Sequence, residues 1–393
     1  MIKSKLFLLL FLGGLLWSCQ DNEPQYDHFV SSTWDQSVGF TTLQIGATQL
    51  FPDFVDEVEY NVDVYHFTYR TNYKGEEIEA SGILGMPKVT EALELPILSI
   101  QRGTIIANSD APSARIDDYS FLAAIATAGY ITILPDLIGF GPTQDMVHPY
   151  FVQDATAAVV RDMILGAREY LPAKNVSHNG DVFLLGYSEG GFATMATQKL
   201  LEEEPISGTN LIAAASGAGA YDIEGMVQHF ANASEYDQPF FLGFVLSAYE
   251  QEYDWSLQFS DFFAEPYATN AEGSFDGSVS SSDLNDLLST DLAELLNPEF
   301  VENWETGTKY SEFREAVETN SLAHWAPTTP TYLYHGTDDE IVPFENSVRS
   351  IELLLAAGTS ESTLTFFEIE EATHGSGFFP MLNSALPIFG EMK

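Results

Sequence analysis

Cysteine and basic residues are what this chain has least of. Its 393 residues include one cysteine, Cys19, so neither an intrachain disulfide nor a cysteine-based metal site is possible. Lysine and arginine number 15 against 58 aspartate and glutamate, which gives a formal net charge of −43. Nucleic acids and anionic membrane surfaces are recognised through clustered Lys and Arg, so we expect neither as a partner.

The apolar stretch near the N-terminus is too short to cross a bilayer. Lys3 and Lys5 precede about a dozen apolar residues, 6–17, which is the size of a signal-peptide core. The segment resembles a bacterial lipoprotein signal, which implies cleavage before Cys19 and lipidation of that residue. An ordinary secretory signal that is cut nearby is the alternative.

Both interpretations of this segment predict export. We expect 1–18 to be a signal peptide and 19–58 to be a tether and N-terminal segment. The lipoprotein interpretation predicts a protein anchored at the bacterial outer membrane, on its periplasmic or cell-surface side. The N-terminal lipid would then be its only contact with the membrane.

Short apolar runs alternate with helical patterns along the rest of the chain. Such runs are typical of strands buried on both faces of a parallel sheet. The predicted strands are 62–69, 78–86, 96–100, 130–134, 182–185, 211–215, 331–334 and 363–369. Apolar residues at roughly the 3.6-residue period predict helices over 154–171, 191–201 and 345–356. This alternation predicts an α/β fold with a mostly parallel central sheet flanked by helices, formed by 59–222 and 325–393.

One segment, 223–324, breaks the alternation. Residues 223–308 contain 17 Asp and Glu but no Lys or Arg, and aromatic residues crowd the first half. We predict a mostly helical cap insertion over the edge of the sheet. Its aromatics either form the core of this small unit or line an apolar cleft. The acidic residues lack the spacing of a calcium-binding loop, so we expect no metal, and no organic cofactor either.

The strongest local motif is Gly186-Tyr187-Ser188-Glu189-Gly190-Gly191. A predicted strand ends directly before it and a predicted helix follows, which is the setting that a nucleophile elbow requires. Flanking glycines let strand and helix approach closely, and the turn aims the backbone N–H of Glu189 at a developing oxyanion. The alternative is a glycine-rich turn in which the serine is incidental.

A serine nucleophile needs a histidine base and a carboxylate, and both follow later in the chain. Asp338 and Asp339 come after the predicted strand 331–334, and His374 comes after the strand 363–369. The order Ser, Asp, His is the one expected of an α/β-hydrolase. His148 is the main competitor for a role in the site, although it precedes the nucleophile, and we interpret His335 as structural.

The chain resembles the α/β-hydrolases, above all their esterase and secretory-lipase branches. The resemblance covers roughly 60–225 and 325–380. The residues that carry it are the 186–191 elbow, Gly336-x-x-Asp339-x-x-Val342-Pro343, His374-Gly375, the 128–130 and 135–141 segments, His148-Pro149-Tyr150 and, more weakly, 217–222.

This resemblance implies specific roles for residues of the chain. It implies a catalytic triad of Ser188, Asp339 and His374, with Asp339 rather than Asp338 as the acid. It implies that the loop after the third core strand supplies a second oxyanion donor beside Glu189. By position we expect the N–H of Thr104, with Arg102 and Gly103 as alternatives.

These residues predict a serine carboxylic-ester hydrolase, an esterase or lipase that works through an acyl-enzyme. The negative charge disfavours anionic substrates, so we expect a neutral ester of a small molecule, lipid or glycan. A serine aminopeptidase on the same fold is one alternative, because an acidic cap could hold a substrate amine. A non-catalytic surface lipoprotein is the other.

Overall fold

The computed structural model describes residues 26–89 and 93–393. The predicted signal peptide 1–18 and the predicted lipidation site Cys19 lie outside these residues. None of the described helices is long and apolar enough to cross a membrane.

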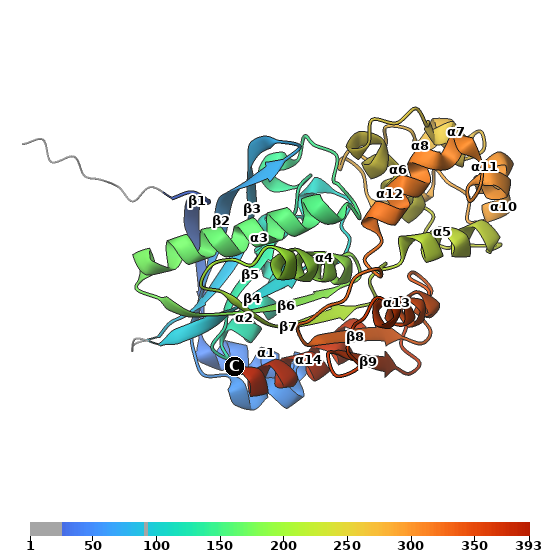
Figure 1. The fold of residues 1–393 in the computed structure, drawn as a ribbon. Helices are drawn as coiled ribbons and strands as arrows, with labels where there is room; N and C mark the ends of the chain where they lie inside the picture. Colours follow the sequence, from blue (N-terminus) through green and yellow to red (C-terminus); the bar gives the residue numbers. More distant parts are fainter. Residues whose placement is uncertain (1–25, 90–92) are drawn as a thin grey trace, which may run out of the picture.

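The described residues form one nine-stranded sheet that runs through the molecule (Figure 1). Its strands are β1 (Phe29–Val38), β2 (Val62–Tyr73), β3 (Glu76–Pro87), β4 (Glu94–Gln101), β5 (Ile131–Pro135), β6 (Ser177–Tyr187), β7 (Asn210–Gly217), β8 (Thr331–Gly336) and β9 (Leu364–Ile369). Their order is β1-β2-β3-β5-β4-β6-β7-β8-β9. Strands β5, β4, β6, β7, β8 and β9 are parallel, whereas β1, β2 and β3 pair antiparallel. The predicted α/β fold with a mostly parallel sheet is therefore confirmed.

Helices cover both faces of the sheet (Figure 1). One face carries α3 (Gln153–Tyr170), α4 (Glu189–Glu203) and α13 (Phe344–Ala356), and the other carries α1 (Phe40–Leu50), α2 (Phe121–Ala126) and α14 (Phe378–Met392). Successive side chains of β6 point to opposite faces of the sheet, so this strand contributes to the hydrophobic core on each face. Val182 and Leu184 join the core beneath α3 and α4, while Phe183 and Leu185 join the core beneath α14.

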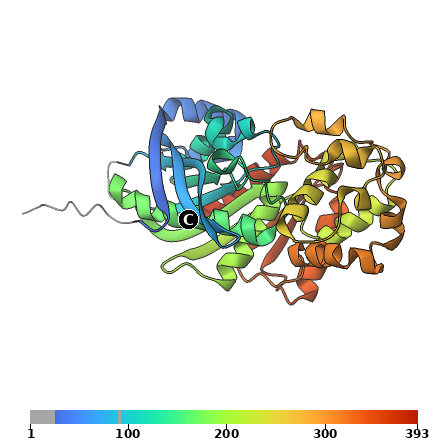
Figure 2. The same cartoon turned by 90° about the horizontal axis from the view of Figure 1, so that it is seen from above.

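Helices also make up the segment between β7 and β8, which we call the cap helices (223–320). They are α5 (Ile223–Asn232), α6 (Phe240–Glu252), α7 (Phe259–Phe262), α8 (Tyr267–Ala271), α9 (Ser281–Asn285), α10 (Leu292–Leu295), α11 (Pro298–Asn303) and α12 (Ser311–Asn320). They lie beyond the carboxyl ends of the parallel strands (Figures 1 and 2). Loops that leave those strand ends therefore meet the cap helices.

The described part of the region that the sequence analysis assigned to a tether and N-terminal segment contains a strand, an α-helix and a short 3-10 helix, Pro52–Glu57. Strand β1 adds an antiparallel edge to the sheet, and α1 follows it. The side chain of Glu169 on α3 accepts hydrogen bonds from the backbone N–H groups of His28 (2.9 Å) and Phe29 (2.8 Å). This carboxylate fixes the start of β1 against α3.

Candidate active site

Ser188 occupies the turn between β6 and α4, where the backbone is strained. Its φ of 61° and ψ of −124° are rarely adopted by a residue with a side chain. Close backbone contact explains the neighbouring glycines: a Cβ on Gly186 would lie 2.1 Å from the carbonyl oxygen of Gly190. A Cβ on Gly190 would lie 2.1 Å from the carbonyl oxygen of Gln101 on β4. The turn therefore presents Ser188 at the carboxyl end of the sheet only with glycine on both sides.

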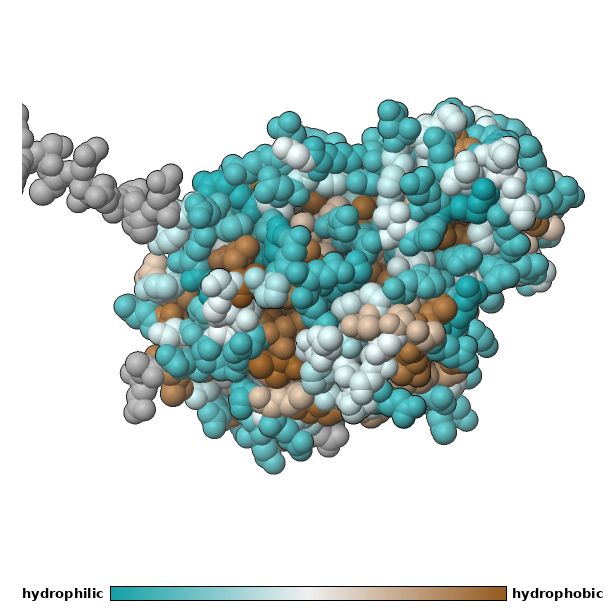
Figure 3. Space-filling view, in the orientation of Figure 1, coloured by the Kyte–Doolittle hydropathy of each residue, from teal (hydrophilic) through white to brown (hydrophobic). Residues whose placement is uncertain are grey.

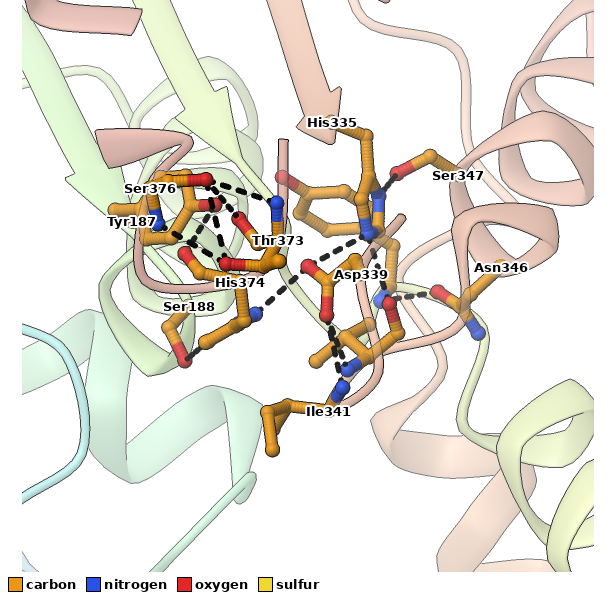
Figure 4. Close-up of polar contacts among 12 residues, drawn as sticks. Tyr187, Ser188, His335, Asp339, Ile341, Asn346, Ser347, Thr373, His374 and Ser376 are labelled. Atoms are coloured by element: carbon orange, nitrogen blue, oxygen red, sulfur yellow. Dashed lines mark hydrogen bonds and ion pairs between the residues drawn. The ribbon is translucent and has the colours of Figure 1, made fainter. Parts of the chain in front are cut away.

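His374 and Asp339 meet Ser188 at this end of the sheet (Figure 4). The Nε2 atom of His374 lies 2.8 Å from the Oγ atom of Ser188, and its Nδ1 atom lies 2.7 Å from Oδ2 of Asp339. The three residues come from the loops that follow β6, β8 and β9, which bring them together across 186 residues of sequence. Asp338, the neighbouring candidate, is exposed, whereas Asp339 is buried.

The Asp339 carboxylate is held from several sides. Its Oδ1 atom accepts hydrogen bonds from the backbone N–H groups of Ile341 and Val342, both at 2.9 Å. Burial raises the pKa of Asp339, but the hydrogen bonds and charges of His335 and His374 outweigh burial and hold the pKa well below its usual value. The carboxylate is therefore ionised and faces the Nδ1 atom of His374.

His335 is a second histidine on this carboxylate, and the sequence analysis did not foresee its contact. The side chain is fully buried, and its Nε2 atom lies 3.1 Å from Oδ2 of Asp339 and 2.9 Å from the carbonyl oxygen of Val342. Its Nδ1 atom lies 2.6 Å from the hydroxyl of Ser347 on α13 (Figure 4). The i, i+4 spacing of His335 and Asp339 across a tight turn is the only sequence signal for this contact.

The two residues expected to form an oxyanion hole flank Ser188. Glu189 is the first residue of α4, so its backbone N–H has no acceptor within the helix. Thr104 lies in the loop after β4, and a Cβ on the adjacent Gly103 would lie 3.7 Å from the Cβ of Ser188. The Thr104 hydroxyl lies 3.0 Å from the hydroxyl of Tyr150. Both segments are thus beside the serine.

The side chain of Glu189 points into the protein and contacts Arg102 and His148. Its Oε2 atom lies 2.7 Å from Nη1 of Arg102, and its Oε1 atom lies 2.7 Å from Nε2 of His148. Burial raises the pKa of Glu189, but the charges and hydrogen bonds of Arg102 and His148 outweigh burial and lower it. The sequence analysis considered Arg102 and His148 singly, and only the structure brings them to one carboxylate.

An apolar cavity of about 100 Å³ begins at Ser188 and extends under the cap helices. Seven cap aromatics line it: Phe230, Tyr236, Phe241, Phe262, Phe263, Phe300 and Phe313. Other cap aromatics, such as Phe240 and Phe259, are buried in the core without lining the cavity. Most of the aromatics that line the cavity also belong to the buried core, so the two roles overlap. Among the described residues that form the wall, none carries a charge.

Three solved structures of similar fold are described as a hydrolase, an esterase and a lipase. The chain is similar to a Legionella pneumophila protein described as a hydrolase, with a TM-score of 0.82 and 24% identity over 93% of this chain and 98% of that one. It is similar to the rice cell wall degrading esterase LipA from Xanthomonas oryzae, with a TM-score of 0.80 and 24% identity over 94% of this chain and 100% of that one. Candida antarctica lipase A in its closed state matches with a TM-score of 0.59 and 15% identity, over 89% of this chain and 78% of that one. At these identities the likeness establishes the fold.

Sequence comparison assigns the family. No curated protein matches the chain. A family model described as secretory lipase does match, over residues 108–386, a stretch that begins after β4 and ends within α14. It contains the elbow, the cap helices and the loops that carry Asp339 and His374. Because this match spans well over half of its residues, the chain belongs to the secretory lipase family.

Proposed function

We propose that this protein hydrolyses neutral carboxylic esters through an acyl-enzyme formed on Ser188. The observation that carries the proposal is the continuous hydrogen-bonded path from Ser188 through His374 to Asp339, with distances of 2.8 and 2.7 Å. Ser188, at one end of this path, lines the apolar cavity, and membership of the secretory lipase family supports ester substrates.

In the proposed mechanism, His374 acts as general base and then as general acid. Its Nε2 atom accepts the hydroxyl proton of Ser188 while Oγ attacks the ester carbonyl carbon. Asp339 accepts a hydrogen bond from Nδ1–H and stabilises the imidazolium. The same proton then passes to the departing alcohol, leaving an acyl-enzyme. Water, activated by His374, hydrolyses the acyl-enzyme and restores the serine.

We assign stabilisation of the tetrahedral oxyanion to the backbone N–H groups of Glu189 and Thr104. Glu189 begins α4, so its N–H also lies at the positive end of the helix dipole. Donors that are fixed before the reaction cost no reorganisation when the charge develops, which makes them effective in a site from which water is excluded.

The proposed substrate is an ester whose acyl or aryl part is apolar. The uncharged wall of the cavity favours such a group and offers no carboxylate to a substrate amine, which weighs against an aminopeptidase. The net charge of −43 disfavours anionic esters. LipA of Xanthomonas oryzae is a cell wall degrading esterase, so an esterified glycan is one neutral ester to test.

We propose that the chain is exported and carries a lipid on Cys19, anchored at the outer membrane. Lys3, Lys5 and the apolar residues 6–17 before Cys19 support this placement, and so does membership of a secretory family. Labelling cells with a radioactive fatty acid should mark the wild type and leave Cys19→Ala unlabelled. Label on neither protein would contradict the anchor.

The testing experiment compares wild type and Ser188→Ala, as full chains in mild detergent, on p-nitrophenyl esters from acetate to palmitate. We expect turnover by the wild type and a loss of at least about a thousandfold in the variant, since the serine forms the covalent bond. Turnover that survives in Ser188→Ala would contradict the mechanism. A folded wild type inactive on all esters would be tested on aminoacyl anilides for peptidase activity. If these too are untouched and a fluorophosphonate does not label Ser188, the protein is a binding protein.

A further inference from the structure

Three charged side chains are buried together directly behind the proposed oxyanion hole. Arg102 follows β4, Glu189 begins α4, and His148 lies in the loop before α3. Their exposed fractions are 1, 2 and 4%, and each of the two contacts to the Glu189 carboxylate is 2.7 Å long. A charge-assisted contact of this length between buried groups holds its partners in one geometry. We call these three residues the Glu189 cluster.

Each ring nitrogen of His148 faces an oxygen atom that can accept a hydrogen bond. The Nδ1 atom lies 2.6 Å from the carbonyl oxygen of Ile138, which can only accept, so Nδ1 donates. The Nε2 atom faces the Glu189 carboxylate, which Arg102 stabilises in its ionised form. A donor at Nε2 as well would make the ring an imidazolium, and the three side chains of the Glu189 cluster would then sum to one positive charge.

Aromatic rings pack around these three side chains, and the buried carboxylate of Asp136 lies near Arg102. His148 packs against Phe140, Tyr150 and Phe244 with ring centroids 5.1 to 5.9 Å apart. Arg102 lies over the ring of Phe140 and donates to the backbone carbonyl of Asp136. The Asp136 carboxylate accepts hydrogen bonds from the hydroxyls of Ser81 and Ser113. Burial raises the pKa of Asp136, whereas these hydrogen bonds and the Arg102 charge lower it. Water that would screen the charge is therefore displaced by protein.

We propose that the Glu189 cluster is a positioning device that fixes the backbone N–H of Glu189 toward the oxyanion and places a net positive charge behind it. The inference rests on the proposed ester hydrolysis, because an oxyanion forms only if Ser188 attacks a carbonyl or phosphoryl group. The negative charge of the tetrahedral intermediate is then stabilised more than that of the neutral substrate. Such an effect raises kcat and leaves KM unchanged.

His148→Gln is the principal test, because it removes the charge while a side-chain amide can still donate to Glu189. We expect kcat on p-nitrophenyl esters to fall about ten- to a hundredfold at unchanged KM. This fall does not exceed the one expected from removing a whole oxyanion-hole donor. The rate of Ser188 labelling by a fluorophosphonate, whose phosphoryl oxygen enters the same hole, should fall in parallel. Values of kcat and labelling rate within twofold of the wild type would overturn the proposal.

Two further variants complete the test: one can be used if His148→Gln does not fold, and the other controls for the general effect of replacing a histidine that contacts a carboxylate. Glu189→Gln has the same shape but leaves Arg102 without its ionic partner, and it should also lower kcat at unchanged KM. It replaces His148→Gln in the test if that variant does not fold. His28→Gln removes another histidine–carboxylate contact, to Glu169 at 3.3 Å beside β1, and should leave kcat and labelling unchanged.

A readout that needs no ester separates failure of this inference from failure of the proposed function. Nuclear magnetic resonance of the full chain labelled with ¹⁵N-histidine reports the protons on each ring, and His148 is assigned as the signal lost in His148→Gln. Protons on both nitrogens at neutral pH would support the charged cluster, and a neutral ring would overturn it. An inactive wild type with an imidazolium at His148 would instead contradict ester hydrolysis.

Discussion

The turn that holds Ser188 depends on individual glycines because backbone atoms of two elements nearly touch there. A methyl group on Gly190 would meet the carbonyl oxygens of Gln101 and Arg102 at 2.1 and 2.7 Å. We predict that Gly190→Ala destabilises the protein by about 2 kcal/mol or more, because backbone cannot move aside as a flexible side chain would. It should also abolish turnover, since the elbow and the loop that carries Thr104 would separate. Urea unfolding and ester hydrolysis measure the two effects.

Gly390→Ala in α14 is the matched control for this change. A methyl group on Gly390 meets no atom within 4 Å, so the helix should tolerate or slightly favour alanine, by up to about 1 kcal/mol. Equal losses of stability in the two variants would show that contact at Gly190 is not the cause.

The buried acid makes stability depend on pH in a defined direction. The folded-state pKa of Asp339 lies below its ordinary value of 3.8, so ionised Asp339 stabilises the fold above about pH 4. That stabilisation is lost as the pH falls below 3.8 toward the lower folded-state pKa. In Asp339→Asn the free energy of unfolding should therefore decline less between pH 5 and 3 than in the wild type. Parallel curves from urea titrations at each pH would contradict the assignment.

Among the elements, α6 decides how much of the cavity an acyl chain can fill. Val245 lies on this helix and lines the cavity wall with Phe241 and Leu242. We predict that Val245→Trp moves the best p-nitrophenyl substrate toward shorter chains, with acetate hydrolysis reduced less than threefold, because indole occupies space that a long chain needs. The chain-length profile of kcat/KM is the measurement.

Gln251→Trp places the same ring on an exposed position at the end of α6 and serves as the control. Its profile should match that of the wild type. An unchanged profile in Val245→Trp would show that the acyl chain lies elsewhere.

The edge strand β1 shows which elements a sequence pattern can miss. The central strands β4 and β6 are buried on both faces, so their apolar runs predict them directly. Strand β1 has water on its outer side, and its residues Ser31, Ser32 and Thr33 break any apolar run. Its place follows from pairing with β2 and from the contact with Glu169, which lies 140 residues away from Phe29.

At the scale of the whole molecule, net charge sets the response to salt. The face in Figure 3 is largely hydrophilic, and a formal charge of −43 implies strong repulsion among its carboxylates. Salt shortens the screening length from about 30 Å at 0.01 M to about 3 Å at 1 M. We predict that Tm at pH 7 rises by several degrees over this range of sodium chloride.

The pH supplies the control for the effect of salt. At pH 5, closer to the sequence pI of about 4.1, fewer charges repel one another and the rise in Tm should be smaller. A rise of equal size at both pH values would point to general salting-out of apolar surface rather than to charge repulsion.

The sequence by itself determined the α/β fold class and the identity of the candidate nucleophile. Both rest on local patterns. A continuous apolar run such as Val182–Leu185 predicts a strand buried on both faces of the sheet, and the elbow motif with its flanking residues predicts a strand, a turn and a helix within about a dozen residues. The positions of Asp339 and His374 after Ser188 in the chain indicated the other two residues of the candidate triad. Only the tertiary structure decided which aromatics line the cavity, that His335 contacts Asp339, and that Arg102 and His148 meet on Glu189. The physical reason is that a buried charge must find its partner in space, and the distance along the chain between the partners, 87 residues for Arg102 and Glu189, leaves no local pattern to read.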